Sequence, residues 1–298
     1  ANSPSASALS NYKKSIANPL TDSIIWIMNY TPNVRKSTQT FVNVLQKAKE
    51  WFASLSKTEQ QNLIDELEHG AGHLTNIRQL NAYIAKYGEI HQAKLLNAYE
   101  KIPSKVWYEG GITVIDYGCG QGIAEMVLSD YLTSRYADND YIKDFILIEP
   151  SRTNLQRCVD YVKAFFRESK ISAYCKRDDQ INDYDINPKS ATVIHIFSNV
   201  IDLDDFDGNG VLSLLNEDKS HNNIIVCVSP YYQEATRGKR IKEFGDKLQG
   251  YSLVYKLEKH TDDWDKPYSC QIYIFVSSYY WQSMPRFVCM GIFRAGVL

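Results

Sequence analysis

Residues 113–122, T-V-I-D-Y-G-C-G-Q-G, decide the fold of this chain. An apolar run ends at Asp116 and passes into three glycines at two-residue spacing, Gly118, Gly120 and Gly122. A helix-compatible stretch, residues 123–132, follows directly. A strand, a glycine turn and a helix in this order are typical of a doubly wound α/β sheet that brings bare backbone close to a nucleotide-like ligand. A Cβ atom at the glycines would block the tight turn or the ligand.

The spacing of the glycines separates this turn from two other ligand-binding motifs. A dinucleotide fingerprint needs a glycine where Ile123 stands, and a phosphate-binding P-loop needs Gly-Lys-Ser/Thr, which the segment lacks. The pattern D-x-G-x-G-x-G resembles the first motif of the class I S-adenosylmethionine (SAM)-dependent methyltransferases. An ordinary glycine-rich turn is the alternative. The resemblance implies that the following residues contact SAM: Asp116, Gly118, Cys119, Gly120, Gln121 and Gly122.

The composition of the 298-residue chain is that of a globular protein, with 44% hydrophobic and 23% charged residues. A net charge of −2 gives no electrostatic support for nucleic acid or an anionic membrane as the main partner. No apolar run could span a bilayer, and the densest one, residues 24–28, is far too short. The first residues lack the apolar core of a secretory signal. We therefore expect a cytoplasmic location and no membrane partner, and leave the oligomeric state open.

The cysteine pattern predicts buried thiols in a reducing compartment and no metal site. The six cysteines show no C-x-x-C pair and no metal-ligand spacing, and most lie in apolar runs; they are Cys119, Cys158, Cys175, Cys227, Cys270 and Cys289. His69 and His73 are four residues apart, but Gly70 and Gly72 between them argue against a metal-binding helix.

The first 105 residues show helical periodicity. Apolar residues recur at three- and four-residue steps from Phe41 to Leu55. An S-x-x-E capping box at residues 56–59 predicts the start of a second helix, which ends at Gly70. A third helical run begins near Ile77, and Pro103 ends it. We predict an all-helical N-terminal region, residues 1–105, that covers the acceptor side of the site.

After residue 105, short apolar strands alternate with helical runs, which predicts a parallel sheet covered on both faces. The expected strands are residues 112–116, 145–148, 171–176, 192–197 and 224–228, with helices such as 154–168 and 236–248. Two later strands, 251–257 and 271–277, have no helix between them and predict an antiparallel closing hairpin. Residues 106–298 thus resemble the whole SAM-binding, Rossmann-like methyltransferase domain. We expect an α/β fold with a doubly wound, seven-stranded, mostly parallel sheet.

Ligands of open α/β sheets bind beyond the carboxyl ends of the strands. The second strand ends at Glu149-Pro150, where we expect the Glu149 carboxylate to accept both ribose hydroxyls of SAM; a solvated glutamate is the alternative. Asp178 and Asp179 follow the third strand. The methyltransferase resemblance implies that one of them accepts the adenine amino group, and a surface charge cluster is the alternative.

The fourth strand runs into Ser198-Asn199. The chain lacks the (Asn/Asp)-Pro-Pro-(Tyr/Phe) tetrapeptide of the adenine and cytosine amino-methyltransferases, and HIFSNVIDL at residues 195–203 resembles small-molecule methyltransferases instead. This resemblance implies that Asn199 lies near the methionine part of SAM. His195, between isoleucines, is interpreted as a core histidine. Residues 205–216 match half of an EF-hand loop, but Asn216 stands where calcium needs glutamate, so we interpret them as a turn before the next helix.

One face of the helix before the first strand could reach a methyl acceptor. Four residues fall at helical spacing on this face: Tyr83, Tyr87, His91 and Lys94. A solvated helix face is the alternative. We expect Lys94 to contact the substrate and His91 or Tyr87 to act as general base where the acceptor arrives protonated. Gly88 costs helix stability and indicates a close approach by another segment.

The methyltransferase resemblance implies that an O, N or S atom of an acceptor attacks the methyl group of SAM and leaves S-adenosylhomocysteine (SAH). Tyr231 and Tyr232 leave the fifth strand and are expected to wall the acceptor pocket. The near-neutral charge favours a small-molecule acceptor. RNA or protein is an alternative acceptor, supported by the basic run at residues 237–242. A non-catalytic SAM-binding module that acts through partners is a further alternative.

Overall fold

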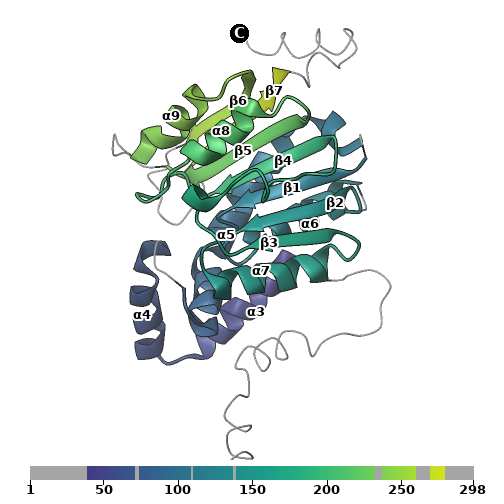
Figure 1. Ribbon diagram of the computed structural model, residues 1–298. Coiled ribbons are helices and arrows are strands. Elements are labelled where there is room, and N and C mark those ends of the chain that lie inside the picture. Colours follow the sequence, from purple (N-terminus) through teal and green to yellow (C-terminus); the bar gives the residue numbers. More distant parts are fainter. Residues whose placement is uncertain are drawn as a thin grey trace, which may run out of the picture. The chain divides into compact units, whose positions relative to one another are not determined.

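Seven strands form the sheet of the computed structural model, in the order β3-β2-β1-β4-β5-β7-β6 (Figure 1). The structure describes residues 39–70, 74–108, 110–136, 139–231, 237–259 and 269–278. The strands are β1 (Ile112–Tyr117), β2 (Ile142–Ile148), β3 (Lys170–Tyr174), β4 (Thr192–Ser198), β5 (Asn222–Pro230), β6 (Tyr251–Lys259) and β7 (Cys270–Ser277). The first five strands pair in parallel, whereas β7 pairs antiparallel with both β5 and β6. This arrangement confirms the predicted doubly wound sheet with an antiparallel closing hairpin.

Helices and short 3-10 turns connect the strands. The α-helices are α3 (Phe41–Ser54), α4 (Lys57–Glu66), α5 (Ile77–Lys101), α6 (Ile123–Tyr136), α7 (Arg152–Phe165), α8 (Asn209–Glu217) and α9 (Arg240–Asp246). The 3-10 turns are η1 (Glu68–Gly70), η2 (Ser104–Tyr108), η3 (Asp178–Gln180) and η4 (Arg237–Lys239). The predicted capping box is present, because the Ser56 side chain accepts from Glu59 N and the Glu59 side chain accepts from Ser56 N. No described helix is long and apolar enough to cross a membrane.

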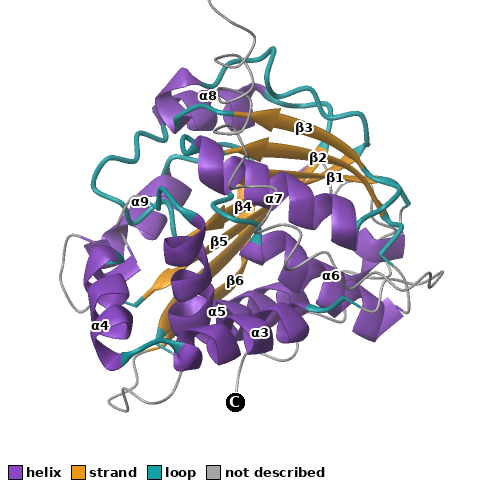
Figure 2. Cartoon of the chain, turned by 90° about the horizontal axis from the view of Figure 1, so that it is seen from below, coloured by secondary structure: helices purple, strands orange, loops and turns teal. Residues whose placement is uncertain are grey.

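Each face of the sheet has its own hydrophobic core, because successive strand residues point to opposite faces. Val114 belongs to the core on the side of α3, α5, α6 and α7, whereas its neighbour Ile115 belongs to the core on the side of α8 and α9. Figure 2 shows α3, α5 and α6 together on one side, with α8 away from them. The sheet is therefore covered on both faces, as the run of buried strand residues predicts.

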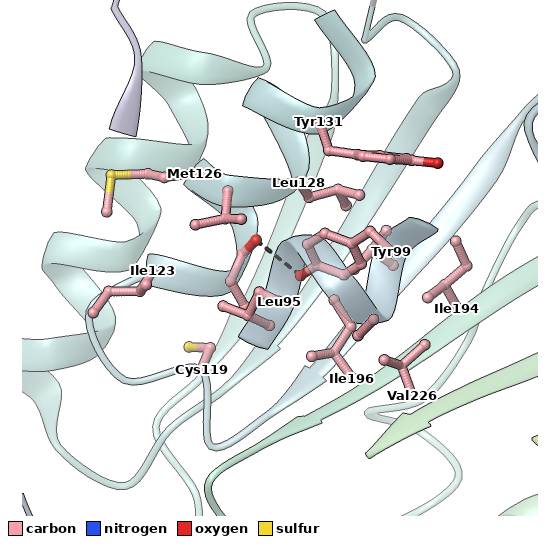
Figure 3. Packing of buried hydrophobic residues seen from close by; sticks show 14 of the residues in the cluster. Leu95, Tyr99, Cys119, Ile123, Met126, Leu128, Tyr131, Ile194, Ile196 and Val226 are labelled. Carbon is pink, nitrogen blue, oxygen red and sulfur yellow. Dashed lines mark hydrogen bonds between the residues drawn. The ribbon is translucent and has the colours of Figure 1, made fainter. Parts of the chain in front are cut away.

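Helices of the predicted N-terminal region share a core with the sheet. The described residues from Gln39 onward belong to one compact unit. The Tyr99 hydroxyl of α5 donates to Ala124 O of α6 over 2.9 Å, in the middle of the packed side chains of Figure 3. Gly88 of α5 faces α3: a Cβ there would lie 2.9 Å from Leu45 Cδ1 and 3.3 Å from Phe41 Cζ. The close approach that Gly88 indicates is therefore the packing of α3 on α5.

Two predicted segments differ from the structure or lie beyond it. The helix predicted at 236–248 is shorter, since α9 begins at Arg240 after the 3-10 turn η4, and Thr236 lies outside the described residues. Only residues 205–208 of the EF-hand-like stretch form a turn before α8, as interpreted, because α8 begins at Asn209 and includes residues 209–216. The predictions for residues 1–38, His73 and Tyr232, and for Cys289, also lie outside the described residues.

Candidate active site

The glycine turn after β1 lies against the end of β2. The backbone N–H groups of Gly118 and Cys119 both donate to Ile148 O, over 2.8 and 3.0 Å. The three glycines have φ values of 71°, 53° and 88° in chain order, in the left-handed region that favours glycine. The turn is thereby fixed at the carboxyl edge of the sheet, where open α/β sheets bind their ligands.

The three glycines differ in what a side chain would meet. A Cβ at Gly118 would lie 2.9 Å from Val200 Cγ2, and one at Gly122 would lie 3.1 Å from Cys158 Cα. These two glycines allow close packing within the protein. A Cβ at Gly120 would meet no atom within 4 Å. Gly120 is therefore the glycine whose missing side chain leaves space for a ligand.

Glu149 holds its carboxylate next to this open glycine. Its Oε2 accepts from Gly120 N over 3.0 Å, and its Oε1 accepts from Ser151 N over 2.9 Å. Asn154 Nδ2 also donates to Oε1, over 3.4 Å. The side chain is only 7% exposed, so backbone and amide donors stabilise the buried charge. The predicted ribose carboxylate and the predicted cofactor glycine thus lie together.

Asp116 and Gln121, both predicted to contact SAM, are buried beneath the turn. Gln121 Nε2 donates to Leu80 O over 3.2 Å, which ties the turn to α5. Asp116 is fully buried beside Glu125 of α6, and burial together with the neighbouring carboxyl raises the pKa of Asp116 well above its usual range. Both side chains are buried, at 0% exposure for Asp116 and 4% for Gln121.

A second polar cluster joins α5 to the end of β4. Lys94 Nζ donates to Asn199 Oδ1 over 2.6 Å, and Asn199 Nδ2 lies 2.9 Å from His91 Nδ1. His91 Nε2 in turn lies 3.0 Å from the Tyr83 hydroxyl. Asn199 has a φ of 58°, a left-handed conformation that asparagine tolerates better than most residues. His91 and Lys94 of this helix face are therefore buried against the end of β4. The solvated-face alternative does not hold for these two residues.

Hydrogen-bonding rules fix the state of His91. A lysine ammonium only donates, so the Asn199 oxygen faces Lys94 and its amide N–H faces His91. His91 Nδ1 therefore accepts, and the neutral ring carries its proton on Nε2, toward Tyr83. Burial lowers the pKa of His91 well below its usual value, and burial also lowers the pKa of Lys94 to about 8.

Asp202 belongs to this cluster but is missing from the predicted site residues. It is 5% exposed, accepts from Ser229 Oγ over 2.8 Å through Oδ1, and its charge partly offsets the lowered pKa of Lys94. Arg240 Nη1 donates to its backbone carbonyl over 2.9 Å. The sequence signal was an acid only three residues after Asn199, in the same strand-end run.

The other predicted site residues are dispersed. Asp178 Oδ2 accepts from Asp207 N, and the exposed Asp179 lies 3.7 Å from Arg177 Nε. Pro150 is exposed, and Tyr231 N donates to Ser269 O over 3.4 Å. Tyr87 packs its ring on Tyr83, with centroids 5.2 Å apart. Tyr87 thereby contacts the second polar cluster through Tyr83, whose hydroxyl lies next to His91.

His195 is a core histidine, as interpreted from the sequence. Its Nδ1 lies 3.1 Å from the Tyr117 hydroxyl and its Nε2 lies 3.0 Å from Asn223 Oδ1. Both ring nitrogens are therefore engaged in the core on the side of α8 and α9. Burial lowers the pKa of His195 to about 4.

No protein-family model matches this chain, and no curated protein matches it. Solved structures with a similar arrangement include the small RNA methyltransferase HEN1, at 13% identity and a TM-score of 0.44, with 64% of this chain and 26% of that chain covered. A SAM-dependent methyltransferase from Leishmania major is 12% identical, with a TM-score of 0.42 and coverage of 72% and 82%. The plantazolicin methyltransferase, solved with SAH, is 10% identical, with a TM-score of 0.42 and coverage of 78% and 98%.

Proposed function

We propose that this chain is a SAM-dependent methyltransferase. The observation that carries the proposal is the pairing of Gly120 with Glu149. A glycine with open space at its Cβ position and a buried carboxylate 3.0 Å from its N–H lie together at the carboxyl edge of the sheet. Bare backbone and a hydroxyl-accepting carboxylate suit the nucleoside part of a ligand. SAM, when bound there, supplies an activated methyl group, so the chain itself mainly provides alignment and exclusion of water.

The cluster of Lys94, Asn199 and His91 supplies the polar groups for an acceptor. Lys94 is 3% exposed, and a pKa of about 8 leaves part of its amine neutral near pH 7 to 8. A neutral amine can take a proton from an acceptor hydroxyl, amine or thiol. His91 has both ring nitrogens engaged, so its role is to orient Asn199. We therefore propose Lys94 as the general base, in place of His91 or Tyr87.

A small-molecule acceptor is favoured over RNA or protein. The basic run at residues 237–242 is the feature that supports RNA, but three of its four basic residues are paired within the chain. Arg237 and Arg240 lie 2.7 and 2.6 Å from the carboxylate of Asp204, and Lys242 lies 2.6 Å from Asp246. A phosphate backbone would have to displace these intramolecular partners. In addition, α5 lies over the end of β4 through the Lys94–Asn199 hydrogen bond.

A transfer assay tests this function. The full chain is incubated with methyl-labelled SAM and cell extract, and the extract is then separated into small molecules, RNA and protein. We expect label in the small-molecule fraction, loss of that label in Lys94→Met, and retention in Lys86→Met, an exposed lysine of the same helix. Label in RNA or protein would contradict the acceptor class. SAM binding without label in any fraction would favour the non-catalytic module.

A further inference from the structure

Three potential metal ligands come together behind the glycine turn. They are the Cys119 thiol in the turn, the Glu125 carboxyl in the first turn of α6 and the Cys158 thiol of α7. One ligand atom from each lies within 4.8 Å of the other two, and all three side chains are buried. Among the described residues this is the single group of histidine, cysteine and acidic side chains with such spacing. We refer to it as the thiol–carboxylate cluster.

The thiol–carboxylate cluster lies beside a second buried carboxyl group, that of Asp116. Glu125 is 0% exposed beside Asp116 and Cys158, and neither of its carboxylate oxygens meets the geometry of a hydrogen bond with a described residue. The same holds for both oxygens of Asp116, which lies beside Glu125. An isolated carboxylate in a dry interior costs several kcal/mol, so such a group is either neutralised by protons or bound to a cation. Because the thiols of Cys119 and Cys158 can act as metal ligands beside this carboxylate, we favour a bound cation.

We propose that Cys119, Cys158 and Glu125 bind a Zn²⁺ ion. Two thiolates and one carboxylate are a ligand set suited to zinc, with Asp116 beside Glu125 available as fourth ligand or as hydrogen-bond donor to the ligating carboxylate. Tetrahedral zinc holds S and O ligands at about 2.0–2.3 Å, which separates ligand atoms by about 3.3–3.8 Å. Side-chain adjustments of about 1 Å therefore close the site. The ion also neutralises two of the three ligand charges.

The sequence predicts no metal site because the three ligands have no characteristic spacing. Cys119 and Glu125 are six residues apart across a turn and a helix start, and Cys158 follows one strand and most of a helix later. A Cβ at Gly122 would lie 3.2 Å from Cys158 Sγ, so this glycine lets α7 approach the turn. A zinc ion here would fasten the turn to α6 and α7 at once.

Metal analysis of the full, untagged chain tests the site. The protein is produced in zinc-supplemented medium, gel-filtered without chelator, and measured for zinc by mass spectrometry. We expect about one zinc per chain in the wild type and loss of stoichiometric zinc in Cys158→Ser and Glu125→Gln. The matched control is Cys227→Ser, a buried cysteine of β5 in the opposite core, which should keep its zinc.

A cobalt titration of the metal-free wild type covers the case in which the variants fold poorly. Stoichiometric Co²⁺ should produce a thiolate-to-cobalt charge-transfer band in the near ultraviolet, and added zinc should abolish it. A wild type without zinc and without this band would overturn the proposal in favour of a proton-sharing cluster. Zinc content unchanged in a folded Cys158→Ser, or a Cys119–Cys158 disulfide in the purified chain, would overturn it as well.

Discussion

Lys94 and Asn199 form a hydrogen bond of 2.6 Å although they are 105 residues apart in the chain. One lies in α5 and the other follows β4, so the bond ties the helix before the sheet to the strand end where an acceptor is expected. It also orients the Asn199 amide toward His91. The predicted helix face and the predicted strand-end residue therefore form one cluster, and its consequences can be measured.

Replacing Lys94 by methionine should change how stability depends on pH. The pKa of Lys94 is lowered to about 8 in the folded chain, against about 10.4 when unfolded. The unfolded chain therefore binds more protons between these pH values, and the free energy of unfolding of the wild type rises across this window. Below about pH 8 the folded wild type carries the full free-energy cost of burying the Lys94 ammonium. The stability gained by Lys94→Met should thus shrink by about 3 kcal/mol between about pH 7 and 10.5.

Urea unfolding of the wild type and of Lys94→Met between about pH 7 and 10.5 measures the difference in their free energies of unfolding. Groups that titrate alike in both proteins cancel in this difference. A stability difference that does not change with pH would show that Lys94 titrates normally.

His91 should be a neutral ring with its proton on Nε2. Its pKa is lowered well below its usual value by burial and by the Lys94 charge. Nitrogen-15 NMR should show this tautomer from about pH 8 down to below about pH 6.5, where a free histidine gains a proton. Since only the unfolded chain then takes up the proton, the free energy of unfolding should fall as pH drops through about 6.5. A ring that protonates near pH 6.5, or one with its proton on Nδ1, would contradict the hydrogen-bond assignment.

Glu149→Ala should weaken SAM binding by about 1.5–3 kcal/mol, the range for hydrogen bonds that involve a charged group. Glu168→Ala is the matched control, because it removes an exposed glutamate that precedes β3 and lies outside the predicted site. Calorimetry measures both dissociation constants. If the dissociation constant of Glu149→Ala equals that of the wild type, the ribose-binding carboxylate lies elsewhere.

Calcium should not bind at residues 205–216 and should therefore leave the stability of the chain unchanged. Asp207 Oδ1 accepts from Asn209 N over 3.1 Å, so this acid is engaged in the turn before α8 instead of gathering with others around an ion. Thermal unfolding with micromolar calcium and then with chelator checks this expectation. A melting temperature that rises with calcium and returns with chelator would disprove it.

Local pattern was sufficient to predict the fold. Alternating apolar strands and helices, and the missing helix between the last two strands, indicate the seven-stranded sheet with its closing hairpin. The order of the last strands was not predicted, since the insertion of β7 between β5 and β6 depends on pairing between distant segments. The start of α9 was predicted too early, because helical periodicity does not distinguish a 3-10 turn from the first turn of an α-helix.

The candidate site was predictable where a motif or a strand end marks it, as at Gly120, Glu149 and Asn199. The sequence did not decide whether Lys94 and His91 are buried against Asn199 or exposed, because a polar helix face is equally compatible with solvent. Asp202, Glu125 and Cys158 were not predicted. Their neighbours come from other elements, so a contact such as that between Glu125 and Asp116 exists only after the helices pack.

Titration of SAM into the full chain by calorimetry tests the proposed cofactor site most directly. We expect saturable binding of one SAM per chain, no binding to Gly120→Val, and wild-type binding to Gly250→Val. Gly250 is the matched control, because it also has a positive φ, 78°, and no atom within 4 Å of its Cβ position, but it precedes β6. The two variants therefore carry similar backbone strain and differ in location. Absence of SAM binding to the wild type, or undiminished binding to a folded Gly120→Val, would contradict the account.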